Sequence, residues 1–314
     1  MPSRKSPRKG SLQFWPRKRA EKHLPSVNWD AIKSGKNLKG FICYKAGMVS
    51  VEVLDNSANS MTKGKKIIIP ATVLECPSMK IFSVRFYKDG KVAKEVLAGK
   101  LDKELKRKVK VPKTYSKKIE DVKSDEYDDL RVICYSVAKQ TGFRKKPDLS
   151  ELGLKGTIEE KLNFIKENLD KEISVTNVFA KDELVDLRGL TRGKGFQGPV
   201  RRFGINLKAH KSEKGVRRPG SLGPWHPARV TFRVPMAGQL GMFTRVIYNN
   251  KIIDMGKSEG QIPILKHFGE VKTNYMIVKG SIQGVAKRQL LITSPLRETK
   301  RTKKKNYELL GVKA

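Results

Sequence analysis

The order of apolar and polar residues along the chain predicts a folded body made mostly of β-strands. Eight stretches are rich in β-branched and aromatic residues, and several of them alternate apolar with polar positions, as half-buried strands do. These stretches cover residues 41–54, 66–74, 80–87, 130–137, 173–179, 242–253, 271–278 and 289–293. Together they are enough to form a sheet that buries one face or both.

One stretch has helical periodicity instead, and it begins at Thr157. Apolar residues recur every three or four positions, which places them on one face of a helix. Thr157 and Glu160 have the spacing of a capping box, in which each side chain binds the backbone N–H of the other residue. The apolar positions on the shared face are Ile158, Leu162, Ile165 and Leu169. We therefore expect an α-containing insertion, at about residues 80–172, within the β body.

The segment from Arg188 to Arg233 has neither pattern. It holds twelve basic residues, one acidic residue, eight glycines and four prolines. Few of these positions suit a core, and glycine and proline interrupt helices and strands, so the segment alone in water should be disordered. A solvated surface loop or an interdomain linker explains this composition, and so does a loop that becomes ordered inside RNA.

Net charge separates these interpretations in part. Lys and Arg total 67 against 31 Asp and Glu, which gives a formal net charge of +36. Such an excess is stabilised by a polyanion, because phosphate contacts release condensed counterions. Membrane surfaces are also anionic, so charge alone does not choose nucleic acid. Residues 1–22 hold eight basic residues and residues 297–314 hold seven, and these two further basic segments favour RNA.

Several other classes of protein receive no support from the sequence. No apolar run of about 18 residues predicts a membrane span, and the N-terminus lacks the apolar core of a secretion signal. Cys43, Cys76 and Cys134 are far apart and form no CxxC pair, which predicts buried, reduced thiols rather than a zinc site. Histidines and carboxylates show no metal-binding or catalytic grouping. We therefore expect a soluble, intracellular protein that is not an enzyme.

Gly193 to Gly198 matches the G-x-G-x-x-G pattern of nucleotide-binding loops. A dinucleotide site also needs a helix after the motif and an acidic residue about 20 positions later. Pro199 and the pair Arg201–Arg202 follow here, and no helical pattern continues. We interpret the motif as a flexible basic turn against phosphate, with a nucleotide pocket as the alternative.

The three tryptophans have different sequence contexts. Trp225 lies in Gly-Pro-Trp-His-Pro, which favours an exposed, rigid apex over the core position that a lone Trp usually takes. Trp15 and Phe14 lie in a basic tail, where they could stack on bases or anchor the tail, and the sequence does not separate these roles. Trp29 precedes Asp30 and Ile32 and is expected to pack in the core.

Several motifs, in this order and spacing, are similar to those of the universal ribosomal protein L3 family of the large subunit, in its archaeal and eukaryotic form. The longest is Asp186-Leu-Arg-Gly-Leu-Thr-Arg-Gly-Lys-Gly-Phe-Gln-Gly198, which closes on Arg202. Others are GFICYKAGM from Gly40, WHPARV from Trp225, AGQLG from Ala237 and SIQGV from Ser281. The resemblance covers nearly the whole chain.

The resemblance implies a mostly β fold, with a closed six-stranded Greek-key barrel of the translation-protein type. It divides the chain into a basic N-terminal extension (1–36) and the first part of the barrel with its α/β insertion (37–187). A long RNA-penetrating loop (188–243), the second part of the barrel (244–296) and a basic C-terminal tail (297–314) follow. Barrel and loop are thus expected to have separate roles.

The residues expected to contact RNA fall into three sets. The basic and aromatic contacts are Arg4, Lys5, Arg8, Lys9, Trp15, Arg17, Lys18, Arg19, Arg188, Arg192, Lys194, Phe196, Arg201, Arg202, Phe203, Lys208, His210, Lys211, Lys214, Arg217, Arg218, Arg229, Arg233, Arg245, Lys300, Arg301, Lys303, Lys304 and Lys305. The loop apex, which the resemblance implies lies near the peptidyl transferase centre, is Trp225 with His226. The glycines expected to let the backbone approach RNA are Gly193, Gly195, Gly198, Gly204, Gly215, Gly223, Gly238 and Gly241.

The resemblance also implies a function and a set of partners. The protein is expected to be a structural constituent of the cytoplasmic large ribosomal subunit that binds large-subunit rRNA and supports early assembly. Neighbouring ribosomal proteins are the other expected partners, with no membrane, no small-molecule substrate and no homo-oligomer. No protein-bound metal or cofactor is expected, apart from Mg²⁺ associated with the rRNA. The alternative from the residues alone is a non-ribosomal RNA-binding or RNA-chaperone protein.

Overall fold

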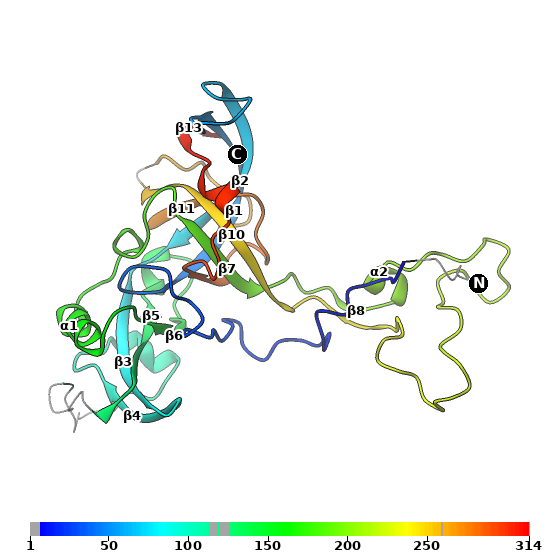
Figure 1. Ribbon diagram of the computed structural model, residues 1–314, viewed down its shortest axis with the longest axis horizontal. Helices are drawn as coiled ribbons and strands as arrows, with labels where there is room; N and C mark the ends of the chain where they lie inside the picture. Colours follow the sequence, from blue (N-terminus) through cyan, green and yellow to red (C-terminus); the bar gives the residue numbers. More distant parts are fainter. Residues whose placement is uncertain (1–6, 113–118, 120–125, 259, 314) are drawn as a thin grey trace. The chain divides into compact units, whose positions relative to one another are not determined.

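The computed structural model of the protein is mostly β, as the sequence predicts (Figure 1). It describes residues 7–112, 119, 126–258 and 260–313. The chain divides into two compact units. Unit 1 comprises Met1–Lys22 and Leu190–Thr244, and unit 2 comprises His23–Gly189 and Arg245–Ala314.

The largest sheet of unit 2 contains seven strands in the order β12-β7-β10-β11-β2-β1-β13, and β1 also pairs with β12. The strands, in chain order, are β1 (Gly40–Asp55), β2 (Lys66–Cys76), β7 (Leu184–Leu190), β10 (Thr244–Lys257), β11 (Asn274–Lys279), β12 (Gln289–Thr293) and β13 (Tyr307–Lys313). The first half of β1 is antiparallel to β12, with Gly40 opposite Thr293, and the second half is antiparallel to β13, with Asp55 opposite Tyr307. The long strand β1 thereby connects both ends of the strand order.

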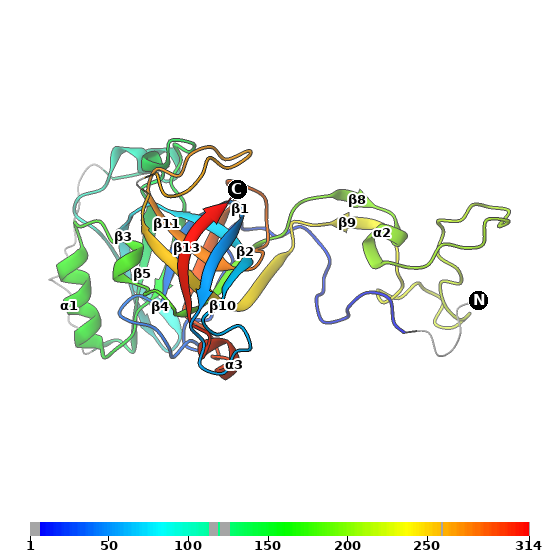
Figure 2. The same cartoon turned by 90° about the horizontal axis from the view of Figure 1, so that it is seen from above.

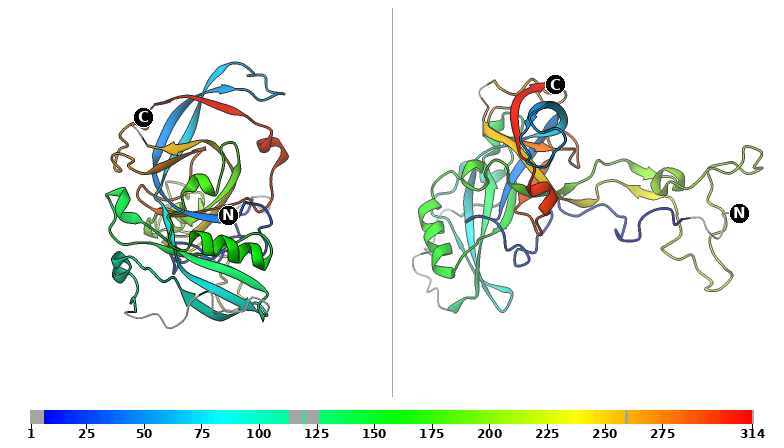
Figure 3. Two further views of the ribbon diagram at one scale, coloured as in Figure 1. Left: turned by 90° about the vertical axis from the view of Figure 1, so that its left-hand side faces the viewer. Right: turned by 45° about the horizontal axis from the view of Figure 1, so that its top comes forward.

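The second sheet is four-stranded, in the order β4-β3-β5-β6. Its strands are β3 (Met79–Lys88), β4 (Lys91–Leu97), β5 (Asp129–Ser136) and β6 (Leu149–Gly153). Helix α1 (Ile158–Asn168) follows β6, and Figure 3 shows it beside this sheet. Short 3-10 helices lie at Lys103–Arg107, Ala138–Thr141 and Val175–Asn177. The predicted α/β insertion thus contains this second sheet and α1.

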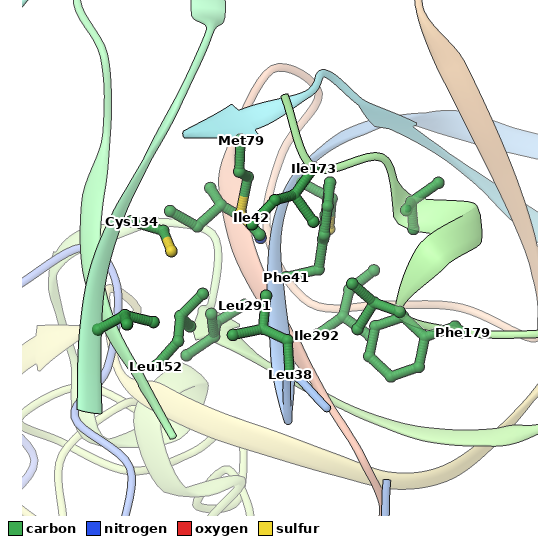
Figure 4. Close-up of a cluster of buried hydrophobic side chains, with 14 of the residues drawn as sticks. Leu38, Phe41, Ile42, Met79, Cys134, Leu152, Ile173, Phe179, Leu291 and Ile292 are labelled. Atoms are coloured by element: carbon green, nitrogen blue, oxygen red, sulfur yellow. The ribbon is translucent and has the colours of Figure 1, made fainter. Parts of the chain in front are cut away.

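A continuous apolar core connects the two sheets of unit 2 (Figure 4). Phe41 and Ile42 of β1 meet Cys134 of β5 and Leu152 of β6, and all four side chains are buried. Because the first half of β1 is buried on both faces, its sequence reads as a continuous apolar run rather than an alternating one. The second half alternates: Val49, Val51 and Val53 are buried while Met48 and Ser50 are exposed.

Most of the predicted elements of unit 2 are confirmed. The predicted helix is α1, and its capping box is present, with the Glu160 N–H donating to Thr157 Oγ1 over 3.4 Å and the Thr157 N–H donating to Glu160 Oε2 over 3.1 Å. Trp29 is buried, and so are all three cysteines, which form no disulfide. No helix among the described residues is long and apolar enough to cross a membrane.

Two features of the prediction for unit 2 are wrong. Residues 173–179 form no strand: after one bridge between Ile173 and Met79, the chain turns into a 3-10 helix. The C-terminal segment is not merely a basic tail, because β13 adds an edge strand to the large sheet. Sequence patterns also missed β4, β6 and β7, which are short or rich in charged residues.

Candidate nucleic-acid interface

Unit 1 contains most of the residues expected to contact RNA, and its regular structure is confined to one short stem. Strand β8 (Gly195–Gln197) pairs with β9 (Gly238–Leu240), and helix α2 (Pro199–Phe203) follows β8 directly (Figure 2). Pro199 occupies the first turn of α2, where its missing N–H costs nothing, and Gly204 ends the helix in a left-handed conformation. The flexible turn expected over Gly193–Gly198 is therefore wrong, because strand β8 and the start of a helix replace it. We call residues 190–204 and 236–244 the stem and residues 205–235 the distal loop.

Arg202 fastens the two limbs of the stem together. Its Nε donates to the carbonyl of Gln239 over 3.0 Å, and its Nη1 donates to the carbonyl of Met236 over 2.9 Å. Its Nη2 donates to the carbonyl of Arg17 over 3.2 Å, which joins the N-terminal segment to the same cluster. Burial lowers the pKa of Arg202, although a guanidinium stays protonated in proteins. Most of its donors are thus directed at protein carbonyls.

Arg17 returns the contact, so the two arginines form a reciprocal clasp. Arg17 Nη1 donates to the carbonyl of Arg202 over 3.0 Å. The ring of Phe203 is buried against both guanidinium groups, with its centroid 4.2 Å from Cζ of Arg17 and 5.2 Å from Cζ of Arg202. Cation–π attraction and hydrogen bonding therefore stabilise the same three-residue cluster.

Trp15 lies in this cluster too. Its ring packs 5.2 Å edge-on from Phe232 and 6.3 Å from Phe203. Five residues after Trp15, the backbone N–H of Ala20 donates to the carbonyl of Met242. In this structure Trp15 anchors the N-terminal segment within unit 1.

The glycines expected to approach RNA divide into two groups. Three of them lie against protein atoms, so that an added Cβ would meet Met242 at Gly193, Arg202 at Gly238 and the Arg192 carbonyl at Gly241. Gly241 also has a left-handed φ of +82°. A side chain there is therefore disfavoured both by the backbone conformation and by the clash with the Arg192 carbonyl. The other five have open space where a Cβ would stand: Gly195, Gly198, Gly204, Gly215 and Gly223.

The distal loop has no core of its own. From Gly204 to Leu240 no residue is buried. Trp225 is 87% exposed, which excludes the core position and matches the exposed apex that the Gly-Pro context predicts. On the stem, Phe196 is 77% exposed. Two large aromatic rings on a soluble surface, among basic residues, are available to stack on bases.

Most of the basic residues expected to contact RNA are exposed. Arg4 and Lys5 lie outside the described residues. The exposed positions are Arg8, Lys18, Arg19, Arg192, Lys194, Arg201, Lys208, His210, Lys211, Lys214, Arg217, Arg218, His226, Arg229, Arg233, Lys300, Arg301, Lys303 and Lys304. The partly buried ones are Lys9, Arg17, Arg188, Arg202, Arg245 and Lys305.

Arg188 and Arg245 belong to unit 2 rather than to the loop. Arg188 lies on β7 and its Nε donates to Thr293 Oγ1 over 3.2 Å. Burial lowers the pKa of both guanidinium groups. Their guanidinium groups are therefore less accessible than that of an exposed arginine such as Arg201.

Comparison with known proteins identifies the family of the chain. The family model described as "Ribosomal protein L3" matches residues 1–313. The chain belongs to the ribosomal protein L3 family. Two archaeal members of the family are named "Large ribosomal subunit protein uL3". The protein from Methanocaldococcus jannaschii is 39% identical over 306 residues, covering 93% of this chain and 91% of its own. The protein from Archaeoglobus fulgidus is 38% identical over 307 residues, covering 94% and 93%.

The clasp in unit 1 was not predicted from the sequence. Sequence reasoning assigned Arg17, Arg202 and Phe203 to RNA and missed their contacts with one another. The sequence offered only a weak signal for these contacts. Arg17 lies two residues after Trp15, Arg202 precedes Phe203, and the two arginines are 185 positions apart along the chain. The N-terminal segment brings Arg17 to Arg202 through the hydrogen bonds that these two arginines exchange.

Proposed function

We propose that this protein is a structural, non-catalytic constituent of the large ribosomal subunit and binds large-subunit rRNA. The observation that carries the proposal is the family match over residues 1–313. It is supported by the net charge of +36 and by a basic extension that buries none of its distal residues. Its location follows as the cytoplasmic ribosome, with rRNA and neighbouring ribosomal proteins as partners and no homo-oligomer.

We propose that the ring of β12, β7, β10, β11, β2 and β1 is the six-stranded Greek-key barrel expected from the family. The support is the pairing of β1 with both β2 and β12. The division into residues 1–36, 37–187, 188–243, 244–296 and 297–314 is part of the same proposal. In it the barrel docks on the rRNA surface, and the loop enters the rRNA interior.

The stem and the distal loop contribute differently to this binding. The clasp of Arg17, Arg202 and Phe203 holds the stem through contacts within the protein. Exposed arginines and lysines of the distal loop neutralise crowded phosphates, and its open glycines let RNA approach the backbone. Because the distal loop lacks a core, it loses conformational entropy on binding, and RNA contacts must offset that loss.

Trp225 and His226 form the apex in this proposal. Their predicted location is near the peptidyl transferase centre and the path of tRNA accommodation, and the protein acts early in subunit assembly. The support is the family resemblance of the WHPARV motif and the 87% exposure of Trp225. A rigid exposed ring of this kind can hold an rRNA base by stacking.

Sedimentation tests the proposed function. Tagged protein in a cell lysate should migrate with large subunits at moderate salt, in one copy per subunit. A non-ribosomal RNA chaperone would stay in the upper fractions or distribute over many RNAs. Either of those results would overturn the ribosomal assignment.

A further inference from the structure

The loop between β1 and β2, residues 56–65, is held in one conformation by a buried carboxylate. Asp55 is 3% exposed, and its Oδ2 accepts from Ser60 Oγ over 2.7 Å and from Thr62 Oγ1 over 2.5 Å. Its Oδ1 accepts from the Ser57 N–H over 3.0 Å. Hydrogen bonds from Ser57, Thr62 and Ser60 hold the pKa of the Asp55 carboxyl well below its usual range. The loop is therefore pre-ordered at neutral pH.

The residue between the two clamped hydroxyls is Met61, and its side chain is 98% exposed. Single apolar side chains on a surface are common and need no explanation alone. Here, however, the neighbours Ser60 and Thr62 are fixed by Asp55, so Met61 is held outward at the tip of a long hairpin.

The exposed charged residues next to Met61 along the chain are all basic. The loop and the first residue of β2 contain Lys63, Lys65 and Lys66 and no acidic residue. Within the described part of the chain, none of these lysines forms an ion pair. The three unpaired ammonium groups can bind phosphates, and the exposed thioether of Met61 can make an apolar contact next to those phosphates.

A second basic segment is fastened to the base of the same loop. Helix α3 (Lys300–Lys303) and the residues after it contain five basic residues and no acidic one. The Asn56 N–H donates to the carbonyl of Asn306 over 3.0 Å, and the Asn306 N–H donates to Ser57 Oγ over 3.0 Å. Figure 2 shows α3 at the same end of β1 and β13 as the loop.

Helix α3 is itself held by a buried charge. Lys251 is 3% exposed, pairs with Asp182 Oδ1 over 3.2 Å, and directs its Nζ at the carbonyl of Lys303 over 3.5 Å. The carboxylate of Glu298 pairs with Lys303, and Glu308 accepts from Asn56. We call the loop at residues 56–66 and the segment 300–306 together the hairpin–helix surface.

We propose that the hairpin–helix surface is a second RNA-binding site, separate from unit 1, that holds an rRNA element with an unstacked nucleotide. The lysines bind the phosphates on either side, and Met61 packs against the exposed base, as apolar side chains do when they wedge against bases. A regular duplex keeps its bases stacked, so the fitting RNA is a loop or a bulge. This inference rests on the proposed function.

Binding of the full-length protein to transcribed large-subunit rRNA, measured over a range of salt, tests the charged part. Changing Lys63, Lys65 and Lys66 to Gln should reduce the salt slope of log K by about two, because phosphate contacts are lost. The matched control changes three exposed lysines of the insertion, Lys88, Lys91 and Lys100, and should leave the slope unchanged. Equal slopes for both triple variants would overturn the proposal.

Met61→Ala tests the apolar part. The variant should bind several-fold more weakly with an unchanged salt slope and an unchanged melting temperature, since Met61 makes no buried contact. Ile264→Ala, which removes a 78% exposed apolar side chain elsewhere on unit 2, should bind like the wild type. Wild-type affinity for Met61→Ala would remove the apolar contact from the site and overturn the proposal.

A photo-crosslinking residue placed at Met61 identifies the partner in assembled large subunits. A cross-link to rRNA, at a nucleotide outside regular helices, is the expected result. A cross-link to a ribosomal protein, or none, would overturn the proposal while leaving the proposed function intact. If the wild-type protein fails to enter large subunits at all, the proposed function itself fails first.

Discussion

The stem and the distal loop of unit 1 are built from similar residues, yet these residues contact other protein atoms in the stem and face solvent in the distal loop. Both are rich in arginine, glycine and aromatic side chains. In the stem, Arg202 donates to carbonyls of Gln239, Met236 and Arg17, and Phe203 is buried between guanidinium groups. In the distal loop, no residue is buried and Trp225 is 87% exposed.

This difference shows that basic, glycine-rich composition alone does not tell whether an arginine binds carbonyls of the protein or faces solvent. A guanidinium that already donates to several carbonyls gains less from a phosphate than an exposed one does, because its hydrogen bonds must be broken first. We therefore infer that the stem is ordered by protein contacts before RNA binds, and that RNA orders the distal loop. Three variants test this comparison in the free protein, in order of expected loss of stem stability.

The largest effect is expected for Phe203→Ala. Removing a buried phenylalanine typically costs about 3 kcal/mol or more, and here the guanidinium groups of Arg17 and Arg202 also lose their ring. Hydrogen exchange should become faster at the amides of Lys194 and Arg202, which are hydrogen-bonded within the stem.

Phe196→Ala is the matched control for that variant, because Phe196 lies on β8 of the same stem and is 77% exposed. It should leave exchange in the stem unchanged and weaken RNA binding instead. If both variants leave the stem amides equally protected, the clasp is not what holds the stem.

A smaller effect is expected for Arg202→Lys, compared with Arg201→Lys. One ammonium cannot reproduce a fork that reaches several carbonyls, so Arg202→Lys should destabilise the stem by about 2 kcal/mol. Arg201 is exposed and has one long hydrogen bond, 3.4 Å to Gln197 Oε1, so Arg201→Lys should leave stem exchange unchanged.

Changes at Arg201 and Arg202 should have the reverse order of effect when the salt slope of RNA binding is measured, with the larger effect at Arg201. Arg201→Gln should lower the salt slope by about one, the loss of a single phosphate contact. Arg202→Lys keeps its charge and should leave the slope near the wild-type value. A lower slope for Arg202→Lys than for Arg201→Gln would reverse the roles assigned here.

The sequence predicted the fold of unit 2 well because its elements have strong local patterns. The apolar run of β1, the alternation in its second half, and the capping box at Thr157 are all local signals. Strand β13 was missed because its sequence, YELLGVK, follows a lysine-rich helix and forms a strand only by pairing with β1. Tertiary context decided that element.

The candidate interface was less predictable than the fold, for a related reason. Charge and glycine content located unit 1 but did not distinguish arginines that bind carbonyls from arginines that face solvent. Arg17 and Arg202 form their contact across 185 residues of sequence, so no local pattern encodes it. The lysines beside Met61 were not predicted either, because three lysines in a short loop resemble any solvated turn until Asp55 is seen to fix it.

The smallest effect on the free protein is expected for Trp225→Ala, and this variant sharpens the comparison most. Trp225 is 87% exposed and lies in a loop without a buried residue, so its removal deletes no core contact. The melting temperature and the exchange of stem amides should both equal those of the wild type.

Subunits that contain the variant should nevertheless accommodate aminoacyl-tRNA or form peptide bonds more slowly, because the base that stacks on the ring loses its support. A large fall in the melting temperature of the Trp225 variant would show instead that the ring packs within the free protein. The distal loop would then have an order of its own, and the distinction between a stem held by protein and a loop held by RNA would no longer stand.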